Sequence, residues 1–208
     1  MIHDFEAWEK YPHHHKWFNK LYLAELMGYK CGPSGLAPDV TDHYVVRPIY
    51  NLSGMGVGAK VIKIEAGDLT KVPPGYFWCE FIAGIQYSAT YDFVDGHWKS
   101  ISCWQGTNDI NDLSRFVSWI RSTYKPKFPL QFNELQDVGR INIEFKGDKP
   151  IEVHLRESPD PNYDELIPVW ADNSVNKEAY LSRGYRYIES YDNANGFLEN
   201  PRIGFLVK

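Results

Sequence analysis

Two segments of strand-forming sequence flank a glycine-rich loop in the first third of the chain. Residues 44–46 and 61–64 are rich in aromatic and β-branched side chains, which favour strands. Gly54, Gly56 and Gly58 alternate in the loop between them. Because glycine lacks Cβ, such a loop adopts positive φ and brings backbone N–H groups close to a ligand. The sequence therefore predicts a hairpin whose loop can hold an anion.

Basic residues stand at both ends of this loop, with Arg47 before it and Lys60 and Lys63 after it. Fixed positive charge beside inward-pointing N–H groups suits a polyphosphate. The alternative is a plain hairpin with solvated basic residues, because short glycine motifs often match by chance. The loop is not a Walker A motif, since no Gly-Lys-Ser/Thr ends it. It is not a dinucleotide fingerprint either, since a strand follows it.

Length and composition limit the class of protein. The 208 residues predict a single domain, residues 1–208, with two lobes at 1–75 and 76–208. A hydrophobic share of 43% and an aromatic share of 15% argue against disorder. The net charge of −5 argues against nucleic-acid binding as the main function.

The cysteines and the apolar runs indicate a compartment. Cys31, Cys79 and Cys103 are odd in number and have no metal-ligand spacing, so we expect reduced thiols. No apolar run has transmembrane length and the first residues do not form a signal peptide, which predicts a cytoplasmic protein without membrane contact. The histidines at 13–15 are interpreted as a surface feature, because the sequence shows no further metal ligand for them.

The periodicity of the other segments predicts an α+β fold of antiparallel sheets with flanking helices. In the first half of the chain the pattern predicts an irregular stretch at 1–15, a helix from 16 to Gly28 and an antiparallel meander over 76–104. A helix over 111–123 follows, capped by Asn111 or Asp112. The last part is predicted to hold strands at 140–145 and 150–156 and short elements at 164–170, 177–190 and 203–207. Glu80 lies inside an apolar strand, so it needs a partner or must point into a site.

The last two strands before residue 157 carry the clearest polar pattern. Glu152, His154 and Arg156 alternate with apolar residues and therefore share one face of a strand. Asn142 and Glu144 share a face of the preceding strand. Facing carboxylates need a cation between them, and oxygen ligands suit Mg²⁺ together with substrate phosphates. The alternative is an exposed sheet face with salt bridges across it.

The order of these elements resembles the ATP-grasp fold, the family of carboxylate–amine and carboxylate–thiol ligases. The motifs cover about two thirds of the chain: Asn19-Lys20 at a helix start, Val-Val-Arg-Pro at 45–48, the loop at 51–58, a strand at 77–84 that ends in Ala-Gly, and the paired strands 142–145 and 152–156. The family would use ATP and Mg²⁺ to turn a carboxylate into an acylphosphate that an amine then attacks.

The resemblance also implies roles for individual residues. The implied phosphate contacts are Arg47, Ser53, Gly54, Met55, Gly56, Gly58 and Lys60 or Lys63; the other nucleotide contacts are Lys20 and Glu80; the ligands of Mg²⁺ or Mn²⁺ are Glu144, Glu152 and His154; and Arg156 is the catalytic residue that binds the substrate carboxylate. The expected partners are ATP and a small-molecule or peptide carboxylate.

Three departures from the family pattern keep a second function open. Arg47 replaces the usual lysine, which keeps the charge but changes its shape. His154 replaces an asparagine, so a single Mg²⁺, a Mn²⁺ preference and lost catalysis are all open. The family's N-terminal domain does not precede Asn19, so a homo-oligomer or a separate partner protein would complete the acceptor site. The alternatives are a catalytically degenerate nucleotide-binding or interaction module, and a β-rich domain unrelated to nucleotide.

Overall fold

The computed structural model describes residues 2–109 and 112–208. The helices are α1 (Asp4–Lys10), α2 (Lys20–Leu26) and α3 (Lys177–Leu181), with 3₁₀ helices η1 (Pro12–Phe18), η2 (Leu130–Val138) and η3 (Ala194–Gly196). The strands are β1 (Cys31–Pro33), β2 (Asp42–Pro48), β3 (Lys60–Ile64), β4 (Tyr76–Glu80), β5 (Gln86–Val94), β6 (His97–Asn108), β7 (Phe116–Arg121), β8 (Arg140–Lys146), β9 (Lys149–His154), β10 (Glu165–Trp170), β11 (Arg186–Asp192) and β12 (Arg202–Val207).

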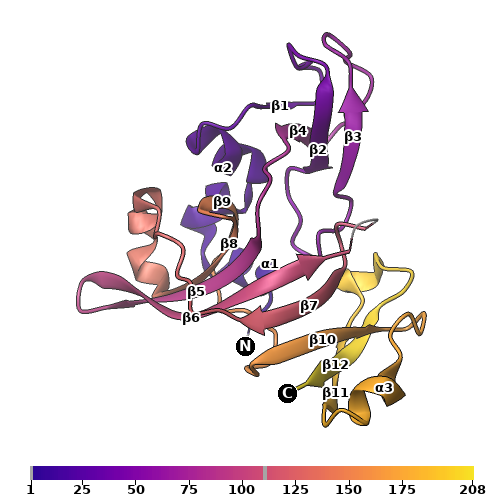
Figure 1. Ribbon diagram of the computed structural model, residues 1–208. Coiled ribbons are helices and arrows are strands. Elements are labelled where there is room, and N and C mark those ends of the chain that lie inside the picture. The colour runs from indigo at the N-terminus through magenta and orange to yellow at the C-terminus, as the bar shows by residue number, and fades with distance from the viewer. Residues whose placement is uncertain (1, 110–111) are drawn as a thin grey trace.

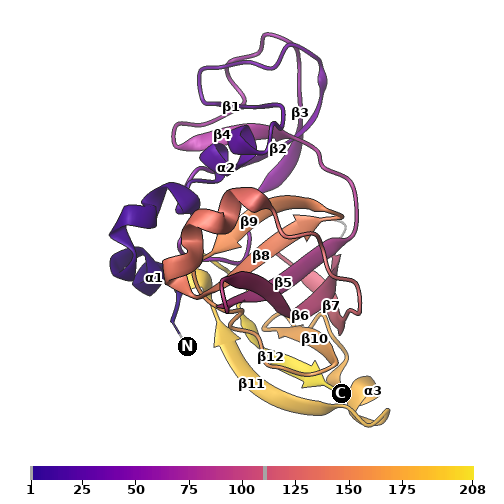
Figure 2. The ribbon, with the colours of Figure 1, turned by 90° about the vertical axis from the view of Figure 1, so that its left-hand side faces the viewer.

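The described residues form a small sheet and a large sheet, with antiparallel pairing throughout (Figure 1). The small sheet has the strand order β1-β4-β2-β3, and the glycine loop joins β2 to β3. The large sheet has the order β11-β12-β10-β7-β6-β5-β8-β9, which can be followed strand by strand in Figure 2. The predicted α+β class and the predicted hairpin around the glycine loop are confirmed.

Local sequence explains where several elements begin and turn. Asn19 is the N-cap of α2, and its Oδ1 accepts a hydrogen bond from the Tyr22 N–H at 2.9 Å. Gly28, with φ of 73°, follows the C-cap and ends the helix as predicted. Asp95 and Gly96 both have positive φ, which makes the tight turn between β5 and β6.

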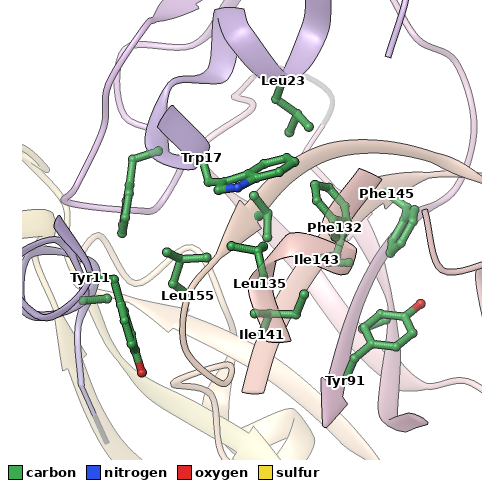
Figure 3. Packing of buried hydrophobic residues seen from close by; sticks show 14 of the residues in the cluster. Tyr11, Trp17, Leu23, Tyr91, Phe132, Leu135, Ile141, Ile143, Phe145 and Leu155 are labelled. Carbon is green, nitrogen blue, oxygen red and sulfur yellow. The ribbon is translucent and has the colours of Figure 1, made fainter. Parts of the chain in front are cut away.

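Alternation along β5, β8 and β9 gives the large sheet two different faces. One face is apolar and packs against α1, η1, α2 and η2 (Figure 3). Its fully buried members include Ile141, Ile143 and Phe145 of β8, which meet Phe132 and Leu135 of η2. The opposite face presents polar side chains, because successive residues of a strand point to opposite sides. This division places the candidate site on the polar face.

Three sequence predictions are wrong. The segment predicted as a helix over 111–123 contains the strand β7. Its apolar spacing also fits a helix, but pairing with β6 and β10 makes the segment a strand. Asn111, one of the two predicted helix caps, lies outside the described residues. Residues 1–15 are not irregular, since α1 and the start of η1 lie there. The strands over 76–104 are not one meander, because β4 pairs with β1 and β2 in the small sheet, whereas β5 and β6 form a hairpin in the large one.

The helix predicted from 16 to Gly28 is divided, because Asn19 has an extended backbone and separates η1 from α2. The tail forms β10, α3, β11 and β12, at the positions where short elements were predicted. All three cysteines are free, and burial raises the pKa of Cys79 to about 12. Among the described helices, none has the length and apolar character needed to cross a membrane.

Replacing Phe132 by alanine tests the packing of η2 on the large sheet. Phe132 is fully buried, so Phe132→Ala should lower the free energy of unfolding by about 3–5 kcal/mol in urea titrations. The matched variant Phe197→Ala removes a ring that is 68% exposed and should change it by less than about 0.5 kcal/mol. Equal losses in the two variants would contradict this packing.

Candidate active site

A cavity of about 1230 Å³ lies against the polar face of the large sheet. Its walls come from the small sheet, the glycine loop, the polar sides of β5, β8 and β9, and the loop after β11. It has an apolar end, where Val45, Val61, Cys79, Phe81 and Ile82 contribute to the lining. A further part of the wall is lined by carboxylates and guanidinium groups, so one cavity offers surfaces for an aromatic ring and for charged groups.

Strand register brings the polar residues of β8 and β9 together. Asn142 pairs with His154, and Glu144 pairs with Glu152. The neighbouring strand β5 supports them, since Gln86 Nε2 donates to Glu144 Oε2 at 2.8 Å. All five residues that the alternation placed on one face (Asn142, Glu144, Glu152, His154 and Arg156) line the cavity. A face with two carboxylates, one imidazole and one guanidinium group can bind a cation and an anion side by side.

Lys20, which does not line the cavity, pairs with the carboxylate of Glu152. The Lys20 Nζ lies 2.6 Å from Glu152 Oε1, and the two side chains are only 7% and 15% exposed. Burial acts to raise the pKa of Glu152, but the charges of Lys20, His154 and Arg47 outweigh it, so the pKa is lowered. Glu152 is therefore an ionised carboxylate at neutral pH, and the helix α2 is joined electrostatically to β9.

Asp4 of α1 reaches the same strand face from the other side. Both of its carboxylate oxygens lie 3.1 Å from His154 Nδ1, and Oδ2 accepts a hydrogen bond from Arg156 Nη2 at 2.8 Å. Burial acts to raise the pKa of Asp4, but His154 and Arg156 outweigh it and hold the pKa well below its usual range. An N-terminal helix thus supplies a buried anion to the site.

The imidazole of His154 lies between three carboxylates. With Nδ1 directed at Asp4, Nε2 lies 3.8 Å from Glu144 Oε1 and 3.7 Å from Glu152 Oε1. Burial acts to lower the pKa of His154, but Asp4 outweighs it, and the pKa rises to about 9. The ring is therefore an imidazolium here, and Nε2 has to lose its proton before it can bind a metal ion.

Two guanidinium groups in the cavity wall have an unpaired donor. Among the described residues, the Nε atoms of Arg47 and Arg156 are buried and have no hydrogen-bond partner. Arg47 is held by the Ile151 carbonyl, which accepts from Nη2 at 2.9 Å, and by the Phe77 ring. Both residues line the cavity, so their guanidinium charge can act on an anion that is bound there.

The glycine loop closes one side of the cavity. Gly54, Met55 and Gly56 have φ of 70°, 55° and 60°, which is the left-handed backbone expected of this loop. Ser53 Oγ accepts a hydrogen bond from Asn195 Nδ2 at 3.2 Å, so the loop meets the segment after β11. Gly56 also packs close to Leu113, since a Cβ added at position 56 would lie 3.2 Å from the carbonyl oxygen of Leu113.

The cavity collects most of the predicted site residues. Those in its lining are Arg47, Ser53, Gly54, Met55, Gly56, Glu80, Glu144, Glu152, His154 and Arg156. Three others lie elsewhere: Lys20 is behind Glu152, Gly58 packs against Pro48 and Tyr76, and Lys60 is exposed at the start of β3. Lys63, the alternative to Lys60, pairs with exposed Glu65 at 2.8 Å.

The sequence did not indicate several charged residues of the cavity lining, and Asp4 and Lys146 are two of them. Asp4 lies in a segment predicted as irregular, and no sequence signal connects it to a strand about 150 residues later. Lys146 also lines the cavity; its Nζ donates to Asn108 Oδ1 at 2.7 Å, and burial lowers its pKa. Lys146 follows Glu144 by two residues, so the alternation of β8 could have indicated it.

Comparison with known proteins supports the fold assignment. No protein-family model and no curated protein matches the sequence. Solved structures do match: the N5-carboxyaminoimidazole synthetase from Staphylococcus aureus has a TM-score of 0.54 and 8% identity, over 91% of this chain and 66% of that chain. The carboxyaminoimidazole ribonucleotide synthase from Aspergillus clavatus, complexed with ATP, has a TM-score of 0.50 and 8% identity, over 92% and 68%.

An ATP-grasp superfamily protein from Archaeoglobus fulgidus matches over 69% of this chain, with a TM-score of 0.41 and 17% identity. This chain spans 47% of the length of that protein. At these identities the likeness concerns the fold. The chain shares with the two synthetases a fold of two antiparallel sheets with few flanking helices, in agreement with the ATP-grasp-like fold that the sequence motifs predicted.

Removing the ammonium group of Lys20 tests the pairing with Glu152. Lys20→Met leaves a buried carboxylate without its cation, so the free energy of unfolding should fall by about 3–5 kcal/mol. Lys16 makes a similar pair with Glu134 at 2.7 Å, but its side chain is 45% exposed. Lys16→Met should therefore cost less than about 1 kcal/mol. Similar losses for both variants in urea titrations would show that burial does not make the Lys20–Glu152 pair more important for the free energy of unfolding than an exposed pair.

The pH dependence of stability tests the Asp4–His154 contact. The raised pKa of His154 gives stability that is fully present below about pH 6.5 and is lost as the pH rises through about 9. The lowered pKa of Asp4 gives stability that is present above about pH 4 and lost on further acidification. The free-energy difference between the wild type and Asp4→Asn should therefore be largest between about pH 4 and 6.5 and shrink toward pH 9. A constant difference would contradict the pairing.

Proposed function

We propose that the protein binds ATP with a divalent cation and uses it to activate a carboxylate for attack by an amine. The observation that carries this proposal is a single cavity in whose wall the guanidinium groups of Arg47 and Arg156 lie beside ionised carboxylates. Such a surface suits an anion and a cation bound together, as in a nucleoside triphosphate with its metal ion.

The phosphates of ATP would lie between the glycine loop and the large sheet. Arg47 offers its guanidinium charge there, and Lys146 adds a second charge from β8. The loop residues Gly54, Met55 and Gly56 have the backbone conformation that lets N–H groups turn toward an anion. The apolar end of the cavity, which includes Phe81 and Ile82 after β4, suits the adenine ring, with Glu80 beside it.

Glu144 and Glu152 fit a hard divalent cation. Two carboxylates plus substrate phosphates are the usual ligand set of Mg²⁺, whose charge stabilises the transferring phosphoryl group. Lys20 and the His154 imidazolium balance these carboxylates in the described state. His154 becomes a third ligand once Nε2 is deprotonated, and an imidazole nitrogen favours Mn²⁺ over Mg²⁺. Asp4 would then hold the ring in place through Nδ1, as carboxylates commonly do for metal-binding histidines.

Arg156 would orient the carboxylate substrate. A guanidinium group binds a carboxylate through two parallel hydrogen bonds, and Arg156 lies in the wall of the cavity. A carboxylate oxygen attacks the γ-phosphorus and ADP leaves, which forms an acylphosphate. The amine then attacks the acyl carbon and phosphate leaves. A homo-oligomer or a separate protein would contribute to the acceptor site, and the free cysteines suit a reducing compartment such as the cytoplasm.

A catalytically degenerate nucleotide-binding or interaction module is the second candidate. Asp4 already pairs with Arg156, and Lys20 already pairs with Glu152. The protein's own side chains therefore already neutralise part of the charge that a bound nucleotide and metal ion would neutralise. ADP formation with a panel of amino acids and peptides as carboxylates and amines separates the two candidates. Turnover supports the ligase, and nucleotide binding without turnover on any of them supports the module.

Isothermal titration calorimetry with ATP and Mg²⁺ tests the phosphate site. Arg47→Ala should weaken ATP binding at least about tenfold, because a charge-assisted hydrogen bond contributes about 1.5–3 kcal/mol. Arg183→Ala is the matched control, since Arg183 is exposed and stacks on Tyr180 away from the cavity. Equal affinity in the wild type and Arg47→Ala would contradict the proposed phosphate contact.

A second variant tests the metal ligands independently of the phosphate contact. Glu152→Gln removes one negative charge but keeps the shape of the side chain, so the gain in ATP affinity on adding Mg²⁺ should shrink at least about tenfold. Glu157→Gln, on the loop after β9, is the control. An undiminished Mg²⁺ effect in Glu152→Gln would exclude Glu152 as a ligand.

A further inference from the structure

A second group of potential metal ligands lies outside the cavity, where η1 meets η2. His13 Nε2 lies 2.8 Å from Asp137 Oδ2, and His14 Nε2 lies 2.9 Å from Asp137 Oδ1. The ligand atoms of the three residues all lie within 4.8 Å of one another. Among the described residues, this is the group of histidine, cysteine or carboxylate side chains that meets this criterion. The missing partner of the histidine run is thus a residue more than 120 positions away.

The backbones that carry these residues are held together by other contacts. The Trp17 and Phe132 rings meet edge to face, with centroids 4.9 Å apart, and both residues are buried. Trp17 Nε1 donates to Glu134 Oε1 at 2.5 Å, and Lys16 Nζ lies 2.7 Å from the same oxygen. The ligand positions are therefore fixed by the packing of η1 on η2, which reduces the ordering that a metal ion would have to impose.

We propose that His13, His14 and Asp137 form a binding site for a borderline divalent transition metal ion, with Zn²⁺ as its probe. Two imidazole nitrogens and one carboxylate oxygen are a common ligand set for Zn²⁺ and its neighbours, whereas Mg²⁺ prefers oxygen ligands only. Hydrogen bonds from His13 and His14 hold the pKa of Asp137 at about 2, so its carboxylate is ionised at neutral pH.

Small movements of the side chains admit the ion once Nε2 of His13 and His14 has lost its proton, either to Nδ1 of the same ring or to solvent. Zinc ligands lie about 2.0–2.2 Å from the metal, so two ligands at a tetrahedral angle are about 3.4 Å apart. The nitrogen–oxygen separations of 2.8 and 2.9 Å have to open by about half an ångström. The side chains of His13 and Asp137 are 60% and 52% exposed, which leaves room for this shift and for a water molecule as fourth ligand.

A bound ion at this site would join two distant parts of the chain. η1 follows α1, which carries Asp4 into the cavity, and η2 precedes β8, which carries Glu144. The ion would therefore fasten the N-terminal segment to the large sheet. It would be separate from the cation proposed between Glu144 and Glu152, because the ligand types of the two sites differ.

Calorimetric titration of the full chain with Zn²⁺, in excess Mg²⁺, tests this site. The wild type should bind one equivalent more Zn²⁺ than Asp137→Asn or His14→Gln does, or bind that equivalent at least about tenfold more tightly. His15→Gln is the matched control, because His15 Nε2 already contacts the Trp8 carbonyl at 2.8 Å and the ring stacks on Trp8. Zn²⁺ should also raise the melting temperature of the wild type and of His15→Gln, but not that of Asp137→Asn.

The variants also show how the proposal would fail. Unchanged Zn²⁺ binding in Asp137→Asn and His14→Gln would place the ion elsewhere, the cavity included. An equal loss in His15→Gln would assign the binding to the histidine run as a whole and not to the trio. No binding by the wild type at 100-fold excess Zn²⁺ would also overturn the site. Asp137→Asn lies at an exposed position, so its melting curve without metal shows directly whether the fold is intact.

Discussion

The buried charges on the inner face of β9 are the constraint on which the site depends. Glu152, His154 and the following Arg156 project away from the apolar core, and each needs a partner because an unpaired buried charge is very costly. Lys20 from α2 and Asp4 from α1 supply those partners. The same contacts therefore neutralise the charges and attach the N-terminal helices to the large sheet, so the site and the fold share one electrostatic network.

Much of this arrangement could be predicted from sequence, because it follows from local rules. The two-residue period of strands places Glu144 and Glu152 on the polar face without any tertiary information, and the structure pairs them directly. Glycine spacing predicts the hairpin loop, since few other residues tolerate its positive φ. The order of these motifs then indicates an ATP-grasp-like fold, which the solved structures share.

The rest depends on contacts between distant segments. Asp4 and Asp137 acquire their partners only when helices pack on the sheet, and no local pattern encodes such pairs. An apolar spacing of three and four residues predicts a helix at β7. A strand that is partly covered on both faces can show the same spacing, so the pattern alone does not separate the two. Lys20 has the position expected of a nucleotide contact at a helix start, yet its charge is directed at Glu152.

In the proposed complex, Glu144 and Glu152 hold a divalent cation against phosphates that are bound by Arg47. A crystal structure with Mn²⁺ and a non-hydrolysable ATP analogue tests it most directly, because Mn²⁺ gives an anomalous signal that locates the ion. We expect an Mn²⁺ peak about 2.2 Å from both carboxylates, with the analogue's phosphates at the Arg47 guanidinium. A cavity without nucleotide, or Mn²⁺ only at His13, His14 and Asp137, would show that this cavity is not the nucleotide and metal site.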